Sequence, residues 1–436
     1  MKFTNKILAV LAAAAGLLAV SCEDQPDAFK LADGVPVVHY VRPVDVTQAD
    51  SLLTGAYLEA SICLVGENLR SVHQMYFNDQ KAILNTSYMT DNTLIVQVPN
   101  AIPGLVTDKM YLINKNQDTV KVDFQVLVPP PAIKGMSCEW APAGSMASLY
   151  GDYFVDDPVV PFHMVFAGAE VDPETVNVTK TEVTFMVPQD AVQGEKVSVT
   201  TVYGSSESVF LYKDNRGLIT DFDGSTDVVP QGWNIAATYD DKDGIAGKYV
   251  QLGPAASPLD ESGAWNEEYK LPFWCGRWDG DPMGITSGAG VPICNIIDFT
   301  DWKNMALKFE LCIPSSNPWS SGAMQIVFTS AERCANDTWQ NNTYIHTSKD
   351  GGLDLCRGMY TPWLETGSFD TGDKWITVTV PFEDFKYNAD GTEGKVALSG
   401  PDDFASLIIW PWSGGVNGTE CTPIFRYDNI RAVPNK

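Results

Sequence analysis

The chain has 436 residues, a formal charge of −26 and 44% hydrophobic residues. This length suggests roughly two to four domains, and the hydrophobic content is high enough to build cores, which excludes a globally disordered chain. The acidity excludes the basic surface that nucleic-acid binding requires, and it suits a neutral partner better than a polyanion.

The first 21 residues have the pattern of an export signal. Lys2 and Lys6 precede an apolar run over residues 7–20, which is too short to span a bilayer and is typical of a signal peptide. The junction Ala19-Val20-Ser21-Cys22 resembles a bacterial lipobox, and the acidic residues after it resemble the export tag of Bacteroidota surface lipoproteins. These resemblances imply a signal peptide over 1–21, lipidation at Cys22 and an acylated linker over 22–35. An ordinary secreted protein with a chance cysteine at this position is the alternative.

The region after the linker has the pattern of a small β-sandwich, because short runs of strand-forming residues alternate with turn residues. In one such run, Leu94, Val96 and Val98 alternate with Ile95 and Gln97, as expected of a strand that is buried chiefly on one face. The predicted strands cover residues 36–43, 56–66, 72–77, 93–99, 109–114 and 120–129.

After a stiff linker, Pro129-Pro130-Pro131, the chain repeats this plan. The run GENL at 66–69 is matched by GDYF at 151–154, and TLIVQVP at 93–99 is matched by EVTFMVP at 182–188. Motifs that recur at such a spacing predict an internal repeat of two sandwiches. The turn followed by a strand ending in Val-Pro resembles the immunoglobulin-like IPT/TIG domain, and this resemblance implies that both sandwiches serve as spacers.

From Gly217 onward, strand-like runs are separated by long loops. This segment opens with GLITDFDG at 217–224, closes with FRYDNIRAV at 425–433, and shows no helical periodicity of useful length. Such a pattern predicts a jelly-roll sandwich over 217–436. An opening Asp-Phe-Asp and a closing Asp-Asn-Ile-Arg are common in carbohydrate-binding jelly rolls.

Eleven of the twelve tryptophans lie in this last half, and only Trp140 precedes it. Tryptophan usually packs in a core, so its repeated placement among glycine, proline and asparagine predicts an apolar surface presented to a ligand. Trp410 and Trp412 share one face of a strand by the period-two rule, and Trp375 either packs or lies on a binding face. The loop candidates for ligand binding are Trp274, Trp278, Trp319, Trp339 and Trp363.

Taken together, these parts resemble the surface glycan-binding proteins of Bacteroidota polysaccharide-utilisation loci, and the likeness is strongest to B-type proteins with a xyloglucan-type binding domain. The most specific segments are NPWSSGAMQIVF at 317–328, YTPWLETGSFDTGDKWITVTVPFEDF at 360–385 and YDNIR at 427–431. The resemblance implies an all-β chain with two tandem immunoglobulin-like (IPT/TIG) sandwiches followed by a C-terminal jelly-roll carbohydrate-binding domain. These domains would cover 36–128, 129–216 and 217–436.

The resemblance also implies a function. It implies a non-catalytic lipoprotein, anchored in the outer membrane by lipid and facing the outside. The lipoprotein would bind a plant polysaccharide, a neutral β-glucan such as xyloglucan or mixed-linkage glucan, near the outer-membrane glycan importer of the same locus. Trp319, Trp363 and Tyr360 fall in the family's loop motifs and are the preferred binding residues, ahead of the other candidates, Trp278, Trp339 and Trp274.

A glycoside hydrolase with a jelly-roll catalytic domain is the competing interpretation. Retaining hydrolysis needs two carboxylates about 5–5.5 Å apart, often displayed as Glu-x-Asp-x-Glu, and the sequence has no such motif. Glu267-Glu268 and Glu383-Asp384 are adjacent pairs, and neighbours on a strand point to opposite faces. Four scattered histidines argue against a histidine-based metal site or triad, and no Gly-x-Ser-x-Gly occurs. We therefore predict no catalytic residue, no metal and no cofactor.

The cysteine pattern leaves two alternatives open. Nine cysteines include no Cys-x-x-Cys pair, which argues against zinc ribbons and thioredoxin-type redox sites. Those in the last half either form disulfides or behave as small buried hydrophobes. They are Cys275, Cys294, Cys312, Cys334, Cys356 and Cys421.

Overall fold

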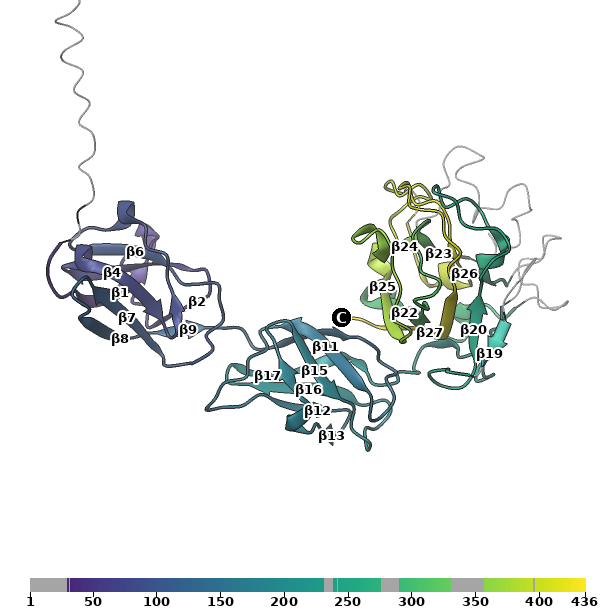
Figure 1. Ribbon diagram of the computed structural model, residues 1–436, viewed down its shortest axis with the longest axis horizontal. Helices are drawn as coiled ribbons and strands as arrows, with labels where there is room; N and C mark the ends of the chain where they lie inside the picture. Colours follow the sequence, from purple (N-terminus) through teal and green to yellow (C-terminus); the bar gives the residue numbers. More distant parts are fainter. Residues whose placement is uncertain are drawn as a thin grey trace, which may run out of the picture. The chain divides into compact units, whose positions relative to one another are not determined.

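The computed structural model describes Lys30 and residues 32–230, 238–240, 242–275, 290–330, 357–394 and 397–436. These residues form an all-β protein whose helical segments are short 3-10 turns (Figure 1). None of the described helical segments is long and apolar enough to cross a membrane. The chain divides into two compact units, Met1–Pro129 and Pro130–Lys436. The first unit holds one sandwich, and the second holds another sandwich and the jelly roll, so the predicted fold class is confirmed.

The first unit is a sandwich of short strands, and the predicted strand regions are confirmed. Alternate residues are buried along its strands, as in β6, where Leu94 and Val96 are buried and their neighbours are not. One sheet has the order β1 (Val37–Pro43), β3 (Ser61–Glu67) and β6 (Thr93–Gln97). The other has the order β5 (Gln80–Lys81), β4 (Val72–Phe77), β7 (Lys109–Asn114) and β8 (Thr119–Asp123), while β2 (Gly55–Tyr57) pairs in parallel with β9 (Gln125–Leu127).

The structure divides two predicted strands: 56–66 becomes β2 and β3, and 120–129 becomes β8 and β9. Glu59 adopts a left-handed backbone conformation with φ 65°, which an extended strand cannot contain. The break lets β2 leave the sheet of β3 and pair with β9 at the end of the unit. Propensity alone could not show this change of partner, because both halves have strand-forming residues.

The second sandwich follows the same plan. Its first sheet has the order β10 (Ala132–Met136), β11 (Met146–Asp152), β15 (Glu182–Met186) and β14 (Asn177–Val178). Its second sheet has the order β13 (Ala169–Glu170), β12 (His163–Phe166), β16 (Lys196–Thr201) and β17 (Gly204–Leu211). The buried side chains of both sheets meet in one core, which includes Leu149, Phe166, Phe185 and Tyr212.

The internal repeat is visible at the backbone level. In the GENL and GDYF turns, the third residue is left-handed in both copies, with φ 57° at Asn68 and φ 59° at Tyr153. The first residue of each turn, Gly66 or Gly151, lies so close to the neighbouring strand that an added Cβ would come within 1.8 Å or 2.1 Å of a carbonyl oxygen. The motif therefore recurs because the same turn needs a glycine in close contact, followed by a left-handed residue.

The jelly roll consists of two sheets that enclose its core. One has the order β19 (Thr238–Asp240), β20 (Tyr249–Leu252), β27 (Phe425–Pro434), β22 (Met305–Cys312) and β25 (Ile376–Pro381), with β18 (Leu218–Thr220) also paired to β27. The other has the order β21 (Leu271–Phe273), β26 (Ser406–Pro411), β23 (Met324–Thr329) and β24 (Gly358–Tyr360). The predicted opening and closing strands of the domain, β18 and β27, are thus neighbours.

Short 3-10 turns connect these strands. Several are capped by the side chain of an Asp or Asn that precedes them, which satisfies a backbone N–H at the start of the turn. The turns are η1 (Val46–Gln48), η2 (Leu69–Ser71), η3 (Thr86–Tyr88), η4 (Pro173–Thr175), η5 (Glu267–Tyr269), η6 (Ile293–Asn295), η7 (Trp302–Asn304), η8 (Pro362–Leu364), η9 (Phe382–Asp384) and η10 (Pro401–Phe404).

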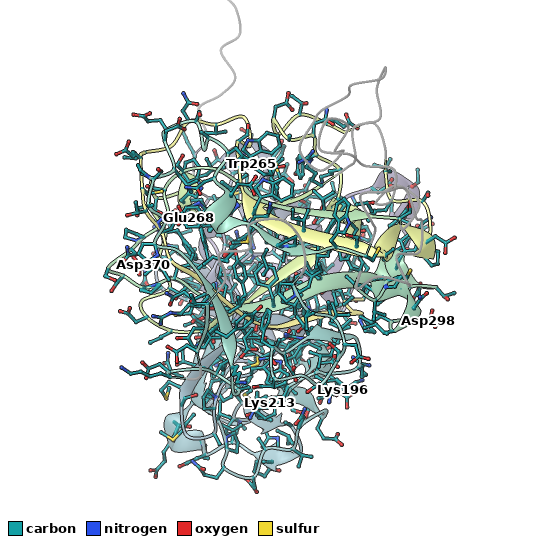
Figure 2. All side chains as sticks on the ribbon, turned by 90° about the vertical axis from the view of Figure 1, so that its right-hand side faces the viewer. Lys196, Lys213, Trp265, Glu268, Asp298 and Asp370 are labelled. Atoms are coloured by element: carbon teal, nitrogen blue, oxygen red, sulfur yellow. The ribbon has the colours of Figure 1, made fainter. Side chains whose placement is uncertain are left out.

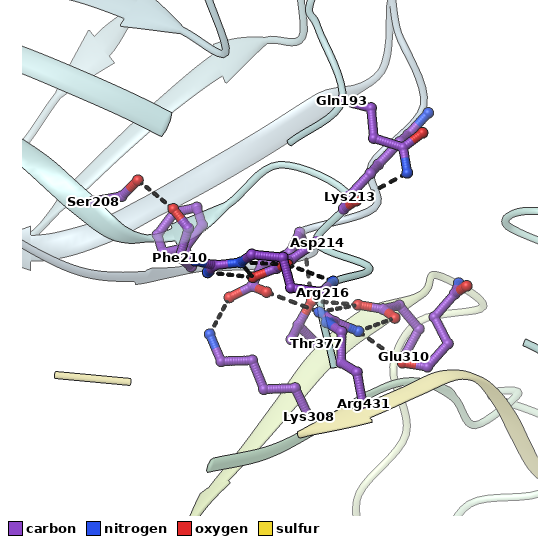
Figure 3. A network of polar contacts seen from close by, with 12 residues as sticks. Gln193, Ser208, Phe210, Lys213, Asp214, Arg216, Lys308, Glu310, Thr377 and Arg431 are labelled. Atoms are coloured by element: carbon purple, nitrogen blue, oxygen red, sulfur yellow. Dashed lines mark hydrogen bonds and ion pairs between the residues drawn. The ribbon is translucent and has the colours of Figure 1, made fainter. Parts of the chain in front are cut away.

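A buried charged network joins the second sandwich to the jelly roll. Glu139 of the sandwich accepts hydrogen bonds from Lys308 on β22 and, at 2.8 Å, from Arg431 on β27. Arg431 also donates to both oxygens of Glu310, at 2.7 and 3.1 Å, and Figure 3 shows these side chains pointing toward one another. The backbone N–H of Glu139 also donates to the hydroxyl of Thr377 at 2.7 Å. The second sandwich and the jelly roll are therefore packed together within one compact unit, Pro130–Lys436.

Five of the described cysteines favour the alternative in which cysteines pack as small hydrophobes without disulfides. Cys63, Cys138, Cys294, Cys312 and Cys421 form no disulfide in the part of the chain that the structure describes. Burial raises the pKa of the Cys312 and Cys294 thiols, so they are less reactive than exposed thiols. Cys334 and Cys356 lie outside the described residues.

Candidate functional site

Two preferred candidates from the sequence, Trp319 and Trp363, lie inside the jelly-roll core. Their exposed fractions are 0% and 3%, and both belong to the core cluster between the two sheets. The indole N–H of Trp319 donates to the carbonyl of Ser321 at 2.7 Å, and that of Trp363 donates to the carbonyl of Gly322 at 3.0 Å. This placement corrects the expectation that these two rings are exposed in loops, because a buried ring offers no face to a ligand.

Tyr360 lies beside Trp319 but also packs inward. Its ring centroid is 6.2 Å from that of Trp319 and 6.3 Å from that of Phe369. Burial raises the pKa of Tyr360 to about 12, which places the hydroxyl in an apolar environment. The structure thus brings Trp319 and Tyr360 together, as part of the core. Trp278, Trp339 and Cys22 lie outside the described residues.

The remaining candidate, Trp274, belongs to a different group of side chains, on the opposite face of the sheet β21-β26-β23-β24. Successive residues of a strand point to opposite faces, so Leu407 and Ile409 of β26 enter the core while Ile408 and Trp410 face away from it. Around Trp410 gather three half-buried tryptophans, Trp265, Trp274 and Trp412, which we call the tryptophan cluster together with Trp410. Figure 2 shows Trp265 at the end of the jelly roll far from Lys196 and Lys213 of the second sandwich.

The cluster has a defined ring geometry. Trp412 stacks on the fully buried Trp410, with ring centroids 6.0 Å apart and planes 20° from parallel. Trp265 meets both rings edge-on, at 5.6 Å and 67° from Trp410 and at 5.8 Å and 79° from Trp412. Edge-to-face and stacked contacts are the favoured arrangements of aromatic pairs. The partly exposed rings of Trp265 and Trp412 are therefore held in place by a buried one.

A buried cation lies under the stacked pair. The guanidinium carbon of Arg357 is 5.8 Å from the ring centroid of Trp410 and 5.5 Å from that of Trp412, which is cation–π geometry. Arg357 donates to the side-chain oxygen of Gln325 at 2.7 Å. The amide nitrogen of Gln325 in turn donates to the carbonyl of Trp412 at 2.5 Å. This chain of contacts ties the Trp412 backbone to the neighbouring strands.

Charged side chains orient Trp265. Its indole N–H donates to Glu267 at 2.7 Å, and the other oxygen of Glu267 pairs with the ammonium of Lys270. The same ammonium lies 5.9 Å from the ring centroid of Trp265. Because the indole N–H is satisfied by a carboxylate, the ring keeps one orientation while its face remains partly accessible.

The loops that carry Trp265 and Trp412 meet backbone to backbone. Gly263 and Gly322 have φ of +64° and +72°, and a Cβ on Gly263 would lie 2.5 Å from the Cα of Gly322. The N–H of Ser413 donates to the carbonyl of Gly263 at 2.8 Å, and the N–H of Ala323 donates to the carbonyl of Ser413 at 3.0 Å. Only glycine permits such a close approach. The loops are therefore fixed to one another beneath the cluster.

Part of the tryptophan cluster has a signal in the sequence. Trp410 and Trp412 share one face of a strand by the period-two rule and Trp274 was a loop candidate, whereas Trp265 was not among the predicted binding residues. The available signal was the position of Trp265 between Gly263 and Asn266, the same turn-like context that marked the other candidates. Within the described residues, no group of three His, Cys, Asp or Glu side chains is arranged to hold a metal ion.

Comparison with known proteins identifies the type of domain. Residues 212–434 match the family model of the surface glycan-binding protein B xyloglucan binding domain. The chain belongs to the surface glycan-binding protein B family. It is also similar to the crystal structure of the surface glycan-binding protein PbSGBP-B from Prevotella bryantii, with 40% sequence identity, a TM-score of 0.78, and coverage of 93% of this chain and 100% of that chain.

A curated relative is named for the IPT/TIG domain. An IPT/TIG domain-containing protein from Bacteroides ovatus is 30% identical over 146 residues, which is 32% of this chain and 28% of that relative. The matched part thus spans less than a third of the relative. Members of the glycan-binding protein B family hold glycans rather than cleave them, so family membership assigns the chain as non-catalytic.

Proposed function

We propose that this protein binds a neutral plant β-glucan, such as xyloglucan or a mixed-linkage glucan, without cleaving it. The observation that carries the proposal is the tryptophan cluster, in which two partly exposed indoles are locked against a buried one inside the family's xyloglucan-binding domain. The two sandwiches before the jelly roll would then serve as spacers.

The chemistry of a sugar ring suits such a surface. A pyranose presents a face of C–H groups, and an indole offers a flat, electron-rich surface of similar size. Burying about 80–100 Å² of apolar surface at roughly 25 cal/mol/Å² stabilises the complex by on the order of 2 kcal/mol per stacked ring. Two or three stacked rings offset the entropy of holding a chain and give dissociation constants of about micromolar to millimolar.

Affinity electrophoresis of the purified protein against a panel of plant polysaccharides tests this function. We expect retardation by xyloglucan or mixed-linkage glucan and none by a polyanionic pectin, because the protein is strongly acidic. The dissociation constant should change little with added salt, since neutral sugars form no ion pairs. Retardation by no neutral glucan would contradict the proposal. Release of reducing sugar during long incubation would revive the hydrolase interpretation.

The proposal extends to the location and partner of the protein. The resemblance of residues 19–22 to a lipobox supports lipidation at Cys22 and anchoring on the outside of the outer membrane. A glycan bound there would lie close to the outer-membrane glycan importer of the same locus. The lipid anchor at Cys22 and the glycan-binding domain would then both contribute to glycan uptake.

Replacing Cys22 with alanine is expected to release the protein from the membrane, because the acyl chain would be lost. Fractionation of cells that express the native chain or Cys22→Ala measures the change. Protease added to intact cells should degrade the native protein on the surface. Protection of the native protein from protease would place it in the periplasm instead.

A further inference from the structure

A hollow in the jelly roll lies at the start of β20, and none of the residues that line it belongs to the tryptophan cluster. It has a volume of about 600 Å³. Two aromatic side chains, Phe222 and Tyr239, form part of its wall, with ring centroids 6.0 Å apart and planes at 53°. Asp223, Asp240 and Lys248 also line it. Tyr239 is 50% exposed, so its ring is accessible from solvent.

The wall of this hollow contains backbone strain. Phe222 has φ 58°, a conformation that is rare for a bulky side chain. A local network holds it there: the N–H of Phe222 donates to the hydroxyl of Thr220 at 3.2 Å, and Asp221 accepts from the N–H of Asp223 at 3.0 Å and from the Ser225 hydroxyl. Strain that is maintained by surrounding contacts is concentrated at functional sites. Here it fixes the ring of Phe222 beside Tyr239.

The hollow is distinct from the tryptophan cluster. Ile245 and Ala246, in the loop between β19 and β20, pack against the core of the second sandwich, so the hollow lies at the end of the jelly roll next to that sandwich. The hollow borders β18 and β19, which belong to the sheet of β27, whereas the tryptophan cluster lies on the outer face of the other sheet. Figure 2 shows Trp265 far from the labelled residues of the second sandwich. The hollow and the tryptophan cluster are therefore separate surfaces of the domain, on different sheets.

We propose that the hollow is a second binding site for one or two units of the same neutral glycan. The proposal rests on the proposed function and extends it. Two aromatic rings offer stacking surfaces, while the carboxylates of Asp223 and Asp240 accept hydrogen bonds from sugar hydroxyls. One oxygen of Asp223 already accepts from the backbone N–H of Lys248 at 2.9 Å, which fixes the carboxylate. Two carboxylates beside a single lysine disfavour an anionic ligand.

Two separated sites on one domain would favour long chains over short ones. A polymer that occupies the tryptophan cluster raises the local concentration of its own sugar units at the hollow, so the second contact costs less than an independent binding event. An oligosaccharide gains nothing from this effect. The second site therefore predicts a preference for polymer that the cluster alone would not produce.

The test uses the purified chain from Glu23 onward and xyloglucan heptasaccharide, observed by saturation-transfer NMR, which detects weak binding. Trp265→Ala with Trp412→Ala should remove binding at the cluster and leave a weaker transfer signal. Adding Tyr239→Ala should abolish that residual signal, whereas Tyr239→Phe should keep it because the ring remains. Tyr57→Ala is the matched control, since Tyr57 is an exposed tyrosine (61%) of the first unit.

A second arm keeps all tryptophans in place. Tyr239→Ala alone should weaken binding of polymeric xyloglucan by roughly fivefold, the effect expected for losing part of one stacking contact, and should leave the heptasaccharide affinity nearly unchanged. An unchanged polymer affinity in this variant would overturn the second site, even if the double tryptophan variant fails to fold. Absence of any heptasaccharide or polymer binding by the native chain would instead contradict the proposed function itself.

Discussion

Replacing Trp412 with alanine is expected to weaken xyloglucan binding by roughly tenfold or more, which corresponds to about 1.4 kcal/mol. Trp412 contributes a half-buried ring whose inner face is stacked on Trp410. Removing it deletes a stacking surface worth on the order of 2 kcal/mol and leaves a gap above the buried ring. Trp265→Ala should have a similar effect, since its ring completes the cluster. Isothermal titration calorimetry of each variant with xyloglucan oligosaccharides measures the loss.

Trp302→Phe is the matched control for this prediction. Trp302 is also half-buried, but it packs against Phe404 with ring centroids 6.0 Å apart, away from the cluster. Its replacement should leave the dissociation constant unchanged. If Trp412→Ala and Trp265→Ala bind like the native protein while Trp278→Ala or Trp339→Ala loses binding, the glycan site lies in other loops than those of the cluster.

The positions of most strands in the first sandwich were predictable, because they depend on local patterns. Apolar residues alternate in 93–99, and this alternation fixes which face of the strand is buried. The paired turns at 66–69 and 151–154 likewise depend on contacts within each sandwich. The break at Glu59 was not predictable, because a left-handed glutamate has no sequence signature of its own. Changes of strand partner depend on the rest of the unit.

The role of each tryptophan was less predictable, because loop composition does not show which way a loop folds. Trp319 lies among Asn317, Ser320 and Ser321, which suggests a surface. In the structure Ser321 is buried too, and its carbonyl satisfies the indole N–H of Trp319. We therefore expect Trp319→Ala to destabilise the fold by about 3–5 kcal/mol rather than only to weaken glycan binding.

The packing of the second sandwich against the jelly roll also could not be predicted from local sequence patterns. The residues of the network that joins them, Glu139, Glu310 and Arg431, are far apart in sequence, and the Asp-Asn-Ile-Arg motif that ends at Arg431 does not indicate which carboxylates pair with it. Burial raises the pKa of Glu310 to about 7, although the nearby Arg431 opposes the shift. Such a carboxylate is stable in the core only because its partners are present.

Replacing Arg431 with methionine is therefore expected to destabilise the second unit by about 3–5 kcal/mol. The substitution leaves Glu310 without its cationic partner and removes one of the two cations that pair with Glu139. Tryptophan fluorescence during chemical denaturation reports this unit alone, since every tryptophan lies in residues 130–436. The matched control is Arg426→Ala on the same strand. Arg426 is half-buried and donates to Gln251 at 3.0 Å, so its loss should cost about 1 kcal/mol.

A second variant separates the unpaired charge from the lost packing. Glu310→Leu combined with Arg431→Met removes both members of the pair, while Glu139 keeps Lys308 as its partner. Replacing a buried ion pair by apolar residues is often neutral, so the double variant should regain most of the stability that Arg431→Met loses. If the double variant is as unstable as the single one, the network acts through shape rather than charge. If Arg431→Met costs no more than Arg426→Ala, the network is not what joins the two domains.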